Sequence, residues 1–254
     1  MLLTRLGLPR LWGDDQAVLW AYLRFAVTPV VYGLTRAAAY GVDRVPVSDG
    51  AIVAANHLNA IDHPLLGVVC PRPVYFISKA ELLEVPVLGE FLGFAGVFPV
   101  HRGKPDREAL RRCRDLARDG NLVGIHVEGT RQRAGHPGEA RKGAALIALQ
   151  EGVPIVPLGL ETFGWSFGHP RRCAAVWGEP IRLDEFPRTR TGRAEATDRV
   201  KTEIVRLWRL AGEAVAAGFP QELSDGTVRS RLPKPSIAEV RGTWAAARAK
   251  ENGA

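Results

Sequence analysis

His57 and Asp62 are the pair of residues in this chain best suited to move a proton. The two residues are five positions apart in the sequence. Residues at this offset do not share a face on a continuous helix, so the two side chains can meet only if a loop turns between them. A carboxylate bonded to one imidazole nitrogen fixes the tautomer and leaves the other nitrogen as a general base. A helix-capping aspartate beside an unrelated loop histidine would give the same spacing. The offset also recurs at His101 and Asp106, where Asp106 is typical of a helix cap, so spacing alone leaves both interpretations open.

The segment Gly164-Trp165-Ser166-Phe167-Gly168 matches the nucleophile elbow of serine hydrolases. Such an elbow needs a helix directly behind the serine, and a histidine later in the chain. Pro170 would break that helix, and no histidine follows His169. We therefore reject a serine hydrolase.

Short apolar runs alternate with longer helical patterns along the chain. We predict buried strands at Ala51–Ala55, Val74–Ser78, Val97–Val100, Leu122–Val127, Ile155–Leu160 and Cys173–Trp177. We predict helices at Asp62–Cys70, Pro86–Phe94, Asp106–Asp119, Gly143–Glu151 and Arg193–Ala217. This alternation predicts an α/β fold with a central, largely parallel or mixed sheet flanked by helices. Ligands of such sheets bind beyond the carboxyl ends of the strands, where the sequence places His57, Arg102 and Glu128.

The length of 254 residues, with 46% hydrophobic and 24% charged residues, is typical of one globular domain with extensions. We expect an amino-terminal helical segment over residues 1–45, an α/β domain over 46–218 and a carboxy-terminal extension over 219–254. The cysteines are odd in number and lack paired spacing, so we expect neither a disulfide framework nor a zinc cluster.

The net charge of +7 predicts an anionic partner. Because no basic run is interleaved with aromatic residues, we expect no nucleic-acid binding. The most apolar stretch, Ala17–Tyr40, is interrupted by Arg24, Pro29 and Arg36 and falls short of the ~20 apolar residues of a membrane span. An amphipathic helix lying on a membrane and a helix packed on the core both fit this stretch.

Four short blocks follow one another in the order found in a known family. They are Asn56-His57 with Asp62, Gly96–Arg102, Glu128–Arg131 and Val153–Pro157. Together with Ser78–Leu82 and Arg141–Ala144 they resemble the PlsC-type glycerolipid acyltransferases, which include the lysophosphatidic acid acyltransferases. The resemblance covers residues 50–161, and four blocks in order are specific where any one of them is not.

The resemblance implies a role for each matching residue. His57 would deprotonate the acceptor hydroxyl, and Asp62 would be its partner. The residues associated with the phosphate of the acceptor would be Arg102, Glu128, Gly129, Thr130 and Arg131, with Lys79 and Arg133 as further candidates.

The chain departs from the family pattern on the acceptor side. His126-Val127 stands where the family usually has Phe-Pro, and Asn59 stands where it usually has Ser. His101 is also unusual beside Arg102. These differences bear on the identity of the acceptor more than on the reaction.

The resemblance implies transfer of a fatty acyl group to a lysophospholipid, such as lysophosphatidic acid. The donor would be acyl-CoA or acyl-carrier protein. The expected place is the cytoplasmic face of the cell membrane, with the protein bound peripherally or monotopically. A thioester is already activated, so we expect no metal or other cofactor. We expect backbone N–H groups near the start of the helix at Asp62 to stabilise the oxyanion.

Two alternatives remain open at this point. The first is a metal-dependent hydrolase that uses His57, His63, His126 and Glu128. The second is a non-catalytic protein that binds acidic lipid through its positive charge.

Overall fold

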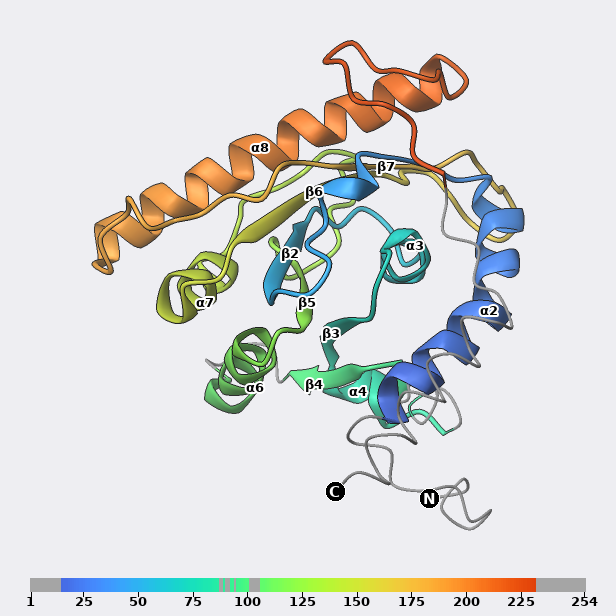
Figure 1. The fold of residues 1–254 in the computed structure, drawn as a ribbon. Coiled ribbons are helices and arrows are strands. Elements are labelled where there is room, and N and C mark those ends of the chain that lie inside the picture. The colour runs from blue at the N-terminus through green and yellow to red at the C-terminus, as the bar shows by residue number, and fades with distance from the viewer. Residues whose placement is uncertain (1–14, 87–88, 90–91, 94, 101–105, 232–254) are drawn as a thin grey trace.

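A computed structural model describes residues 15–86, 89, 92–93, 95–100 and 106–231, and for residues 15–23 it describes the backbone alone. Its centre is one sheet in the order β1-β7-β6-β2-β5-β3-β4 (Figure 1). The strands are β1 Ala38–Tyr40, β2 Ala51–Ala55, β3 Val74–Lys79, β4 Val97–Val100, β5 Leu122–His126, β6 Ile155–Glu161 and β7 Ala174–Trp177. Neighbouring strands pair in parallel except β6 and β7, which are antiparallel. The predicted α/β class with a largely parallel, mixed sheet is confirmed.

Helices cover both faces of this sheet (Figure 1). They are α2 Asp15–Thr35, α3 Asp62–Val69, α4 Ala80–Leu83, α6 Arg107–Arg118, α7 Gly143–Glu151 and α8 Arg190–Ala216, with a 3₁₀ turn η1 at Val42–Arg44. The predicted strands and helices in the described residues agree with these bounds to within a few residues. The predicted helix at Pro86–Phe94 lies partly outside the described residues, and β1, η1 and α4 were not predicted.

Strand β2 shows how the sheet is held between two apolar layers. Its alternate residues Ala51, Val53 and Ala55 join the cluster formed with α2 and α3. Ile52 and Ala54 join the cluster formed with α6, α7 and α8. Because successive side chains of a strand point to opposite faces, a continuous apolar run is what a doubly covered strand requires.

Helix α8 packs unusually close to β6. A Cβ atom on Gly159 of β6 would lie 2.2 Å from the backbone carbon of Leu207 and from the backbone nitrogen of Trp208. A side chain at this position would therefore push the helix off the sheet, and glycine permits the close approach.

Helix α2 buries polar residues and exposes apolar ones. Arg24, Thr28 and Thr35 are buried at helical spacing, whereas Phe25 and Val30 are exposed. The guanidinium of Arg24 donates to the carbonyl oxygens of Val68 (3.5 Å) and Pro71 (3.3 Å), at the end of α3. The predicted helix is present and packs against α3, while its lying on a membrane stays a prediction. Among the described residues, no helix has the length and apolar content needed to cross a bilayer.

Residues 219–231 run back along the free edge of the sheet beside β1. Tyr40 and Arg229 form an antiparallel bridge, and the N–H of Ser230 donates to the carbonyl of Ala39 (2.8 Å). Leu223 is buried against the layer of β1, β7 and α8. The segment thus covers an edge strand that would otherwise present unpaired backbone groups.

Candidate active site

The carboxyl ends of β6, β2, β5 and β3 lie at one edge of the sheet, because these strands are parallel. Thr162 follows β6, His57 follows β2 at one residue's distance, His126 ends β5 and Lys79 ends β3. Residues far apart in the sequence are therefore delivered to one place, which is where α/β sheets bind their ligands.

His57 and Asp62 are in direct contact at this edge. The Nδ1 atom of His57 lies 2.8 Å from Oδ2 of Asp62, and both side chains are buried. The chain turns between β2 and α3, as the five-residue offset requires, and Asp62 is the first residue of α3. The predicted contact is thus present, while the catalytic role of the pair stays a prediction.

The two carboxyl oxygens of Asp62 both accept hydrogen bonds from the surrounding chain. Oδ2 also accepts from the backbone N–H of Leu58 (2.7 Å) and of Asn59 (2.8 Å), and Oδ1 accepts from the hydroxyl of Thr162. A carboxylate so surrounded by donors is an acceptor toward His57, so the imidazole carries its proton on Nδ1. Nε2 is then the nitrogen with a lone pair. Because the two amides are bonded to Asp62, our expectation that N–H groups of this turn stabilise the oxyanion is wrong for these two groups.

Two asparagines tie the turn to β6 and to the loop that follows it. The amide of Asn56 donates to the carbonyl of Leu160 (2.9 Å) and accepts from its N–H (2.7 Å). The amide of Asn59 donates to the carbonyl of Trp165 (2.8 Å). Paired bonds of this kind hold the loop to a rigid strand, and they limit the positions that the His57 ring can take.

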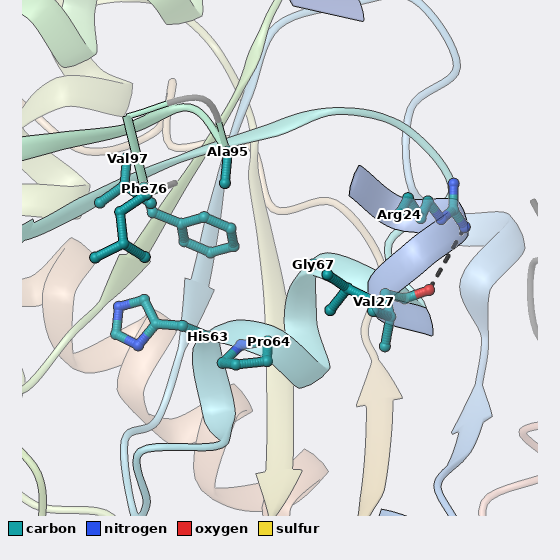
Figure 2. A pocket seen from close by; sticks show the side chains of 10 residues that line it. Arg24, Val27, His63, Pro64, Gly67, Phe76, Ala95 and Val97 are labelled. Carbon is teal, nitrogen blue, oxygen red and sulfur yellow. Dashed lines mark hydrogen bonds between the residues drawn. The ribbon is translucent and has the colours of Figure 1, made fainter. Parts of the chain in front are cut away.

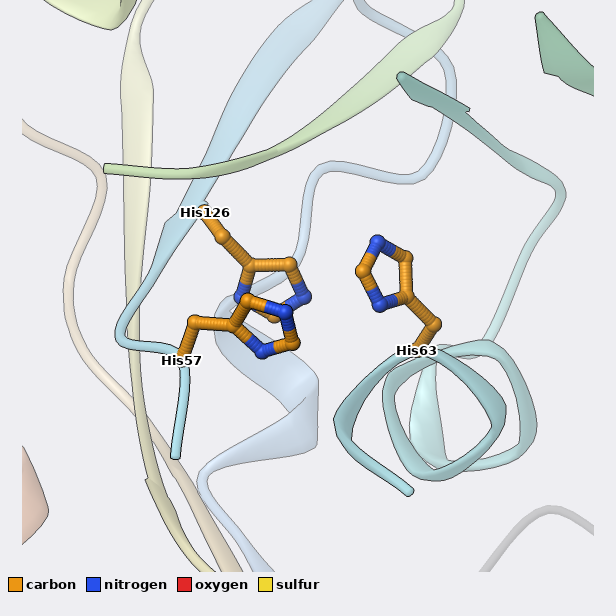
Figure 3. Close-up of side chains that lie close together, drawn as sticks. All are labelled: His57, His63 and His126. Carbon is orange, nitrogen blue, oxygen red and sulfur yellow. The ribbon is translucent and has the colours of Figure 1, made fainter. Parts of the chain in front are cut away.

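His63 and His126 lie against His57 (Figure 3). The rings of His57 and His126 are stacked with centroids 4.2 Å apart, and the ring of His63 lies 4.4 Å from that of His126. Nδ1 of His126 is 2.7 Å from the carbonyl oxygen of Asn56, so it donates and Nε2 has the lone pair. Burial, followed by the neighbouring His63 and His57, lowers the pKa of His126 well below its ordinary value. His126 is therefore neutral at physiological pH.

The loop after β5 carries Glu128, a second buried carboxyl. Neither of its oxygens makes a hydrogen bond in the described part of the chain. Burial raises the pKa of Glu128, although nearby backbone N–H groups, including that of His57, oppose the rise. The loop is fixed to the first block, since the N–H of Gln132 donates to the carbonyl of His57 (2.7 Å). Gly129 has a φ of 69°, a left-handed conformation that favours glycine.

A pocket of about 310 Å³ opens above the His57 ring. Its wall includes His57, His63, Ile77, Val100, Asp106, Leu110, Ile125, His126, Gly129 and Arg141. Arg141 lies against the third block, because its Nε donates to the carbonyl of Glu128 (3.1 Å). Among the described residues, the pocket wall thus combines imidazoles, apolar side chains and one guanidinium, that of the exposed Arg141.

A smaller apolar pocket of about 140 Å³ lies behind His63 (Figure 2). Its wall is formed by Val27, Pro64, Phe76 and neighbouring small residues, with Arg24 at the end opposite His63. His63 lines both pockets.

The other predicted site residues have different places. Thr130, Arg131, Arg133 and Lys79 are exposed on the same edge of the sheet and do not form the pocket wall. Arg102 lies outside the described residues, as does His101. The roles assigned to these residues from the resemblance stay predictions.

Sequence reasoning missed Thr162 and Arg141. Thr162 stands two residues after the predicted strand Ile155–Leu160, so it lies at a strand end, as His57, Arg102 and Glu128 do. Arg141 belongs to a segment that resembles the family, but nothing in the sequence brings it near Glu128. Asp106 caps α6, as predicted, by accepting from the N–H of Ala109 (2.9 Å). Ser166 lies in a turn with His169 and no helix follows it directly, which agrees with rejecting the elbow.

Comparisons with known proteins show what the chain as a whole resembles. Residues 36–161 match the family model described as Acyltransferase. The 1-acyl-sn-glycerol-3-phosphate acyltransferase BAT2 of Brassica napus is 34% identical over 148 residues, which are 57% of this chain and 41% of the plant protein. The 1-acyl-sn-glycerol-3-phosphate acyltransferase of Bacillus subtilis (strain 168) is 28% identical over 150 residues, 58% of this chain and 74% of that protein.

The fold has a solved counterpart. The crystal structure of the 1-acyl-sn-glycerophosphate (LPA) acyltransferase PlsC from Thermotoga maritima matches with a TM-score of 0.64 and 22% identity, over 81% of this chain and 86% of that chain. The match to the plant relative spans less than half of that protein's length, at 41%.

Proposed function

Since residues 36–161 belong to the PlsC-type acyltransferase family, we propose that this protein transfers a fatty acyl group from a thioester to the hydroxyl of a lysophospholipid. Lysophosphatidic acid is the proposed acceptor, and acyl-CoA or acyl-carrier protein is the proposed donor. The observation that carries the proposal is the buried contact between His57 and Asp62, 2.8 Å long, at the edge of the sheet where ligands bind.

His57 is the proposed base. The acceptor hydroxyl gives its proton to Nε2 of His57 while its oxygen attacks the thioester carbonyl. The tetrahedral intermediate then collapses, the C–S bond breaks, and the leaving thiolate takes the proton back from the imidazolium. General-base help of this kind contributes roughly 10²–10⁴-fold to the rate, and Asp62 supports it by holding the ring and stabilising the imidazolium.

The pocket above His57 is the proposed site of the acceptor headgroup. Arg141 is the guanidinium of the pocket wall, and a guanidinium matches phosphate through paired donors at fixed geometry. We propose that Arg141 binds the phosphate of the acceptor. Arg102 and Arg131, the two arginines that the resemblance indicates for this role, would bind it as well.

The exposed face of α2 supports attachment to a membrane surface. Phe25 is 44% exposed and Val30 is 58% exposed, while Arg24 on the opposite face is buried in the protein. A helix in contact with water would have its faces reversed. An apolar outer face on a basic protein suits an interfacial helix on anionic lipid.

The loop between β6 and β7 extends this apolar surface. The indole N–H of Trp165 donates to the carbonyl of Leu34 (3.0 Å), so the loop lies at the end of α2 (Figure 1). On this loop Phe163 is 45% exposed and Phe167 is 79% exposed. Arg171 follows them and is also exposed, which adds positive charge next to the aromatic rings.

The reaction is tested with purified protein, oleoyl-CoA and lysophosphatidic acid in mixed micelles. The variant His57→Ala should lower turnover by about 10²–10⁴-fold, because it removes the base. His136→Ala, at an exposed histidine outside the pocket, is the matched control. A His57→Ala variant that folds, as judged by its melting temperature, and retains full turnover would refute the assigned base.

Membrane attachment is tested by sedimentation with vesicles that contain phosphatidylglycerol. Val30→Asp should weaken binding, because it places a charge on the proposed lipid-facing side of α2. Val47→Asp is the matched control, since Val47 is 92% exposed and lies at the opposite edge of the sheet, before β2. Equal binding by both variants would contradict the proposed orientation.

A further inference from the structure

Three histidines from three separate elements line the larger pocket, and their rings lie close together (Figure 3). His57 comes from the loop after β2, His63 from the first turn of α3 and His126 from the end of β5. One ring nitrogen from each lies within 4.8 Å of the others. The reaction proposed above uses His57 alone, so it leaves the other two imidazoles unexplained.

The hydrogen bonds of His57 and His126 leave one nitrogen of each ring with a lone pair. Nδ1 of His57 is bonded to Asp62 and Nδ1 of His126 to the carbonyl of Asn56. Both bonds place the proton on Nδ1, so each Nε2 presents a lone pair. Nε2 of His126 is buried and reaches no hydrogen-bond partner among the described residues. A buried acceptor without a donor needs either a proton donor or a cation.

We propose that His57, His63 and His126 form a binding site for a divalent transition-metal ion of the zinc type, and that the bound ion inhibits acyl transfer. Binding stands on the cluster itself, whereas inhibition rests on the proposed function. The ion would take up the lone pair of His57 Nε2, which the acceptor hydroxyl needs for its proton. Inhibition therefore follows from binding without any further movement of the chain.

The ligand set selects the class of ion. Three imidazoles suit zinc, copper or nickel, and among the residues that the structure describes no carboxylate joins the group to favour magnesium or calcium. Asp62 is placed as the outer partner that orients a metal-bound imidazole. Zn–N bonds are about 2.0–2.1 Å long, so the rings must close in from their present separation. His63 lines both pockets.

One of the three histidines stands at a position where this chain differs from the family pattern. His126 stands where the resemblance gives phenylalanine, which cannot bind a metal. The substitution His126→Phe therefore removes a ligand while it introduces a ring that the fold of the family accommodates. This makes the site a property of this chain and supplies a variant designed to fold.

Binding is tested on chelator-treated, desalted protein with Co²⁺ alone, followed by visible absorption, and with Zn²⁺ alone, followed by calorimetry. We expect one ion per chain with a low-symmetry Co²⁺ spectrum, and loss of both signals in His126→Phe and in His63→Phe. His136→Phe, at an exposed histidine, should bind like the wild type. Melting temperatures identify any variant that fails to fold. Binding that survives in a folded His126→Phe variant would overturn the site.

Inhibition is tested by acyl transfer at increasing Zn²⁺. The Zn²⁺ concentration that halves the rate should rise more than about 100-fold in His126→Phe, since outer partners of a metal ligand alone contribute 10–100-fold to affinity. Activation by Zn²⁺, or ester hydrolysis that a chelator abolishes, would overturn the inhibitory role and favour the metal hydrolase. If the Co²⁺ results hold but metal-free protein transfers no acyl group, the site stands, and the proposed function fails together with inhibition.

Discussion

Two carboxyl groups are buried at neighbouring strand ends of this protein, and their surroundings are opposite. Asp62, at the end of the loop after β2, accepts from His57, two backbone N–H groups and the hydroxyl of Thr162. Glu128, on the loop after β5, makes no hydrogen bond through its carboxyl oxygens among the described residues. Exposure does not separate them, because Asp62 is 0% exposed and Glu128 is 3% exposed.

The donors, and not the degree of burial, decide what each carboxyl can do. A buried carboxylate with donors on both oxygens can remain charged and orient a neighbouring imidazole. A buried carboxyl that makes no hydrogen bond among the described residues resists ionisation, and burial raises the pKa of Glu128 although backbone N–H groups nearby oppose the rise. Asp62 has the hydrogen-bond donors that a buried carboxylate needs. Glu128 forms no such bonds among the described residues, so it is stabilised either by a bound ligand or by its own proton.

The comparison predicts its largest effect at Asp62. Asp62→Asn should lower turnover by about 10³–10⁴-fold, because an amide offers donors where His57 and two N–H groups also donate, and the tautomer of His57 is lost. The variant should also unfold more easily, by about 2–4 kcal/mol, since a buried network is broken. The rate of acyl transfer from oleoyl-CoA measures the first effect, and unfolding in urea measures the second.

Asp115→Asn is the control for Asp62→Asn. Asp115 is 48% exposed and pairs with Arg118 on the surface of α6, so turnover should be unchanged. If Asp62→Asn costs no more turnover than Asp115→Asn, the contrast between the two buried carboxyls has no functional meaning.

Thr162→Val should show the next largest effect. Valine keeps the shape of threonine but leaves Oδ1 of Asp62 without its donor, at a cost of about 1–3 kcal/mol in unfolding free energy. Turnover should fall by about 10-fold, which corresponds to 1.4 kcal/mol. Thr162→Ser retains the hydroxyl and should recover most of both losses. A serine variant as impaired as the valine variant would show that packing, and not the hydrogen bond, is what Thr162 contributes.

The sequence predicted the sheet and the first block well because both follow local rules. Runs such as Ala51–Ala55 are apolar throughout, which a strand covered on both faces requires. The contact between His57 and Asp62 follows from a strand end, a helix start and the short loop between them. All three signals lie within a dozen residues of one another.

What the sequence could not give depends on long-range packing. Strand β1 has three residues and lies in an apolar stretch that reads as helix, and it forms because β7 pairs with it. The faces of α2 were ambiguous because apolar residues surround the helix, and the carbonyls at the end of α3 determine where Arg24 points. Thr162 donates to Asp62 although the two residues are a hundred positions apart in the sequence, and no local sequence pattern predicts that they meet.

Gly129→Ala tests how the third-block loop is held beside Glu128. Alanine at a φ of 69° costs about 1–2 kcal/mol, and its Cβ would also lie 2.9 Å from Nε of Arg141. Gly152→Ala is a matched control, since Gly152 has a φ of 68° and no atom within 4 Å of the added carbon. The excess loss in unfolding free energy of Gly129→Ala measures the displacement of Arg141. Equal losses would indicate that the loop tolerates a side chain there.

Glu128→Gln should have the smallest effect and the opposite sign. The folded-state pKa of Glu128 is raised by burial, so its contribution to stability is fully present below the ordinary pKa of 4.5 and is lost as the pH rises through the folded value. Glutamine keeps the shape of the protonated side chain and does not titrate, so the variant should gain stability relative to the wild type as the pH rises. Urea unfolding at pH 5 and at pH 8, with the exposed Thr130→Ala as a control for the loop, measures the difference. A variant that loses stability at the higher pH would mean that Glu128 has donors like those of Asp62, and the contrast between the two carboxyls would fail.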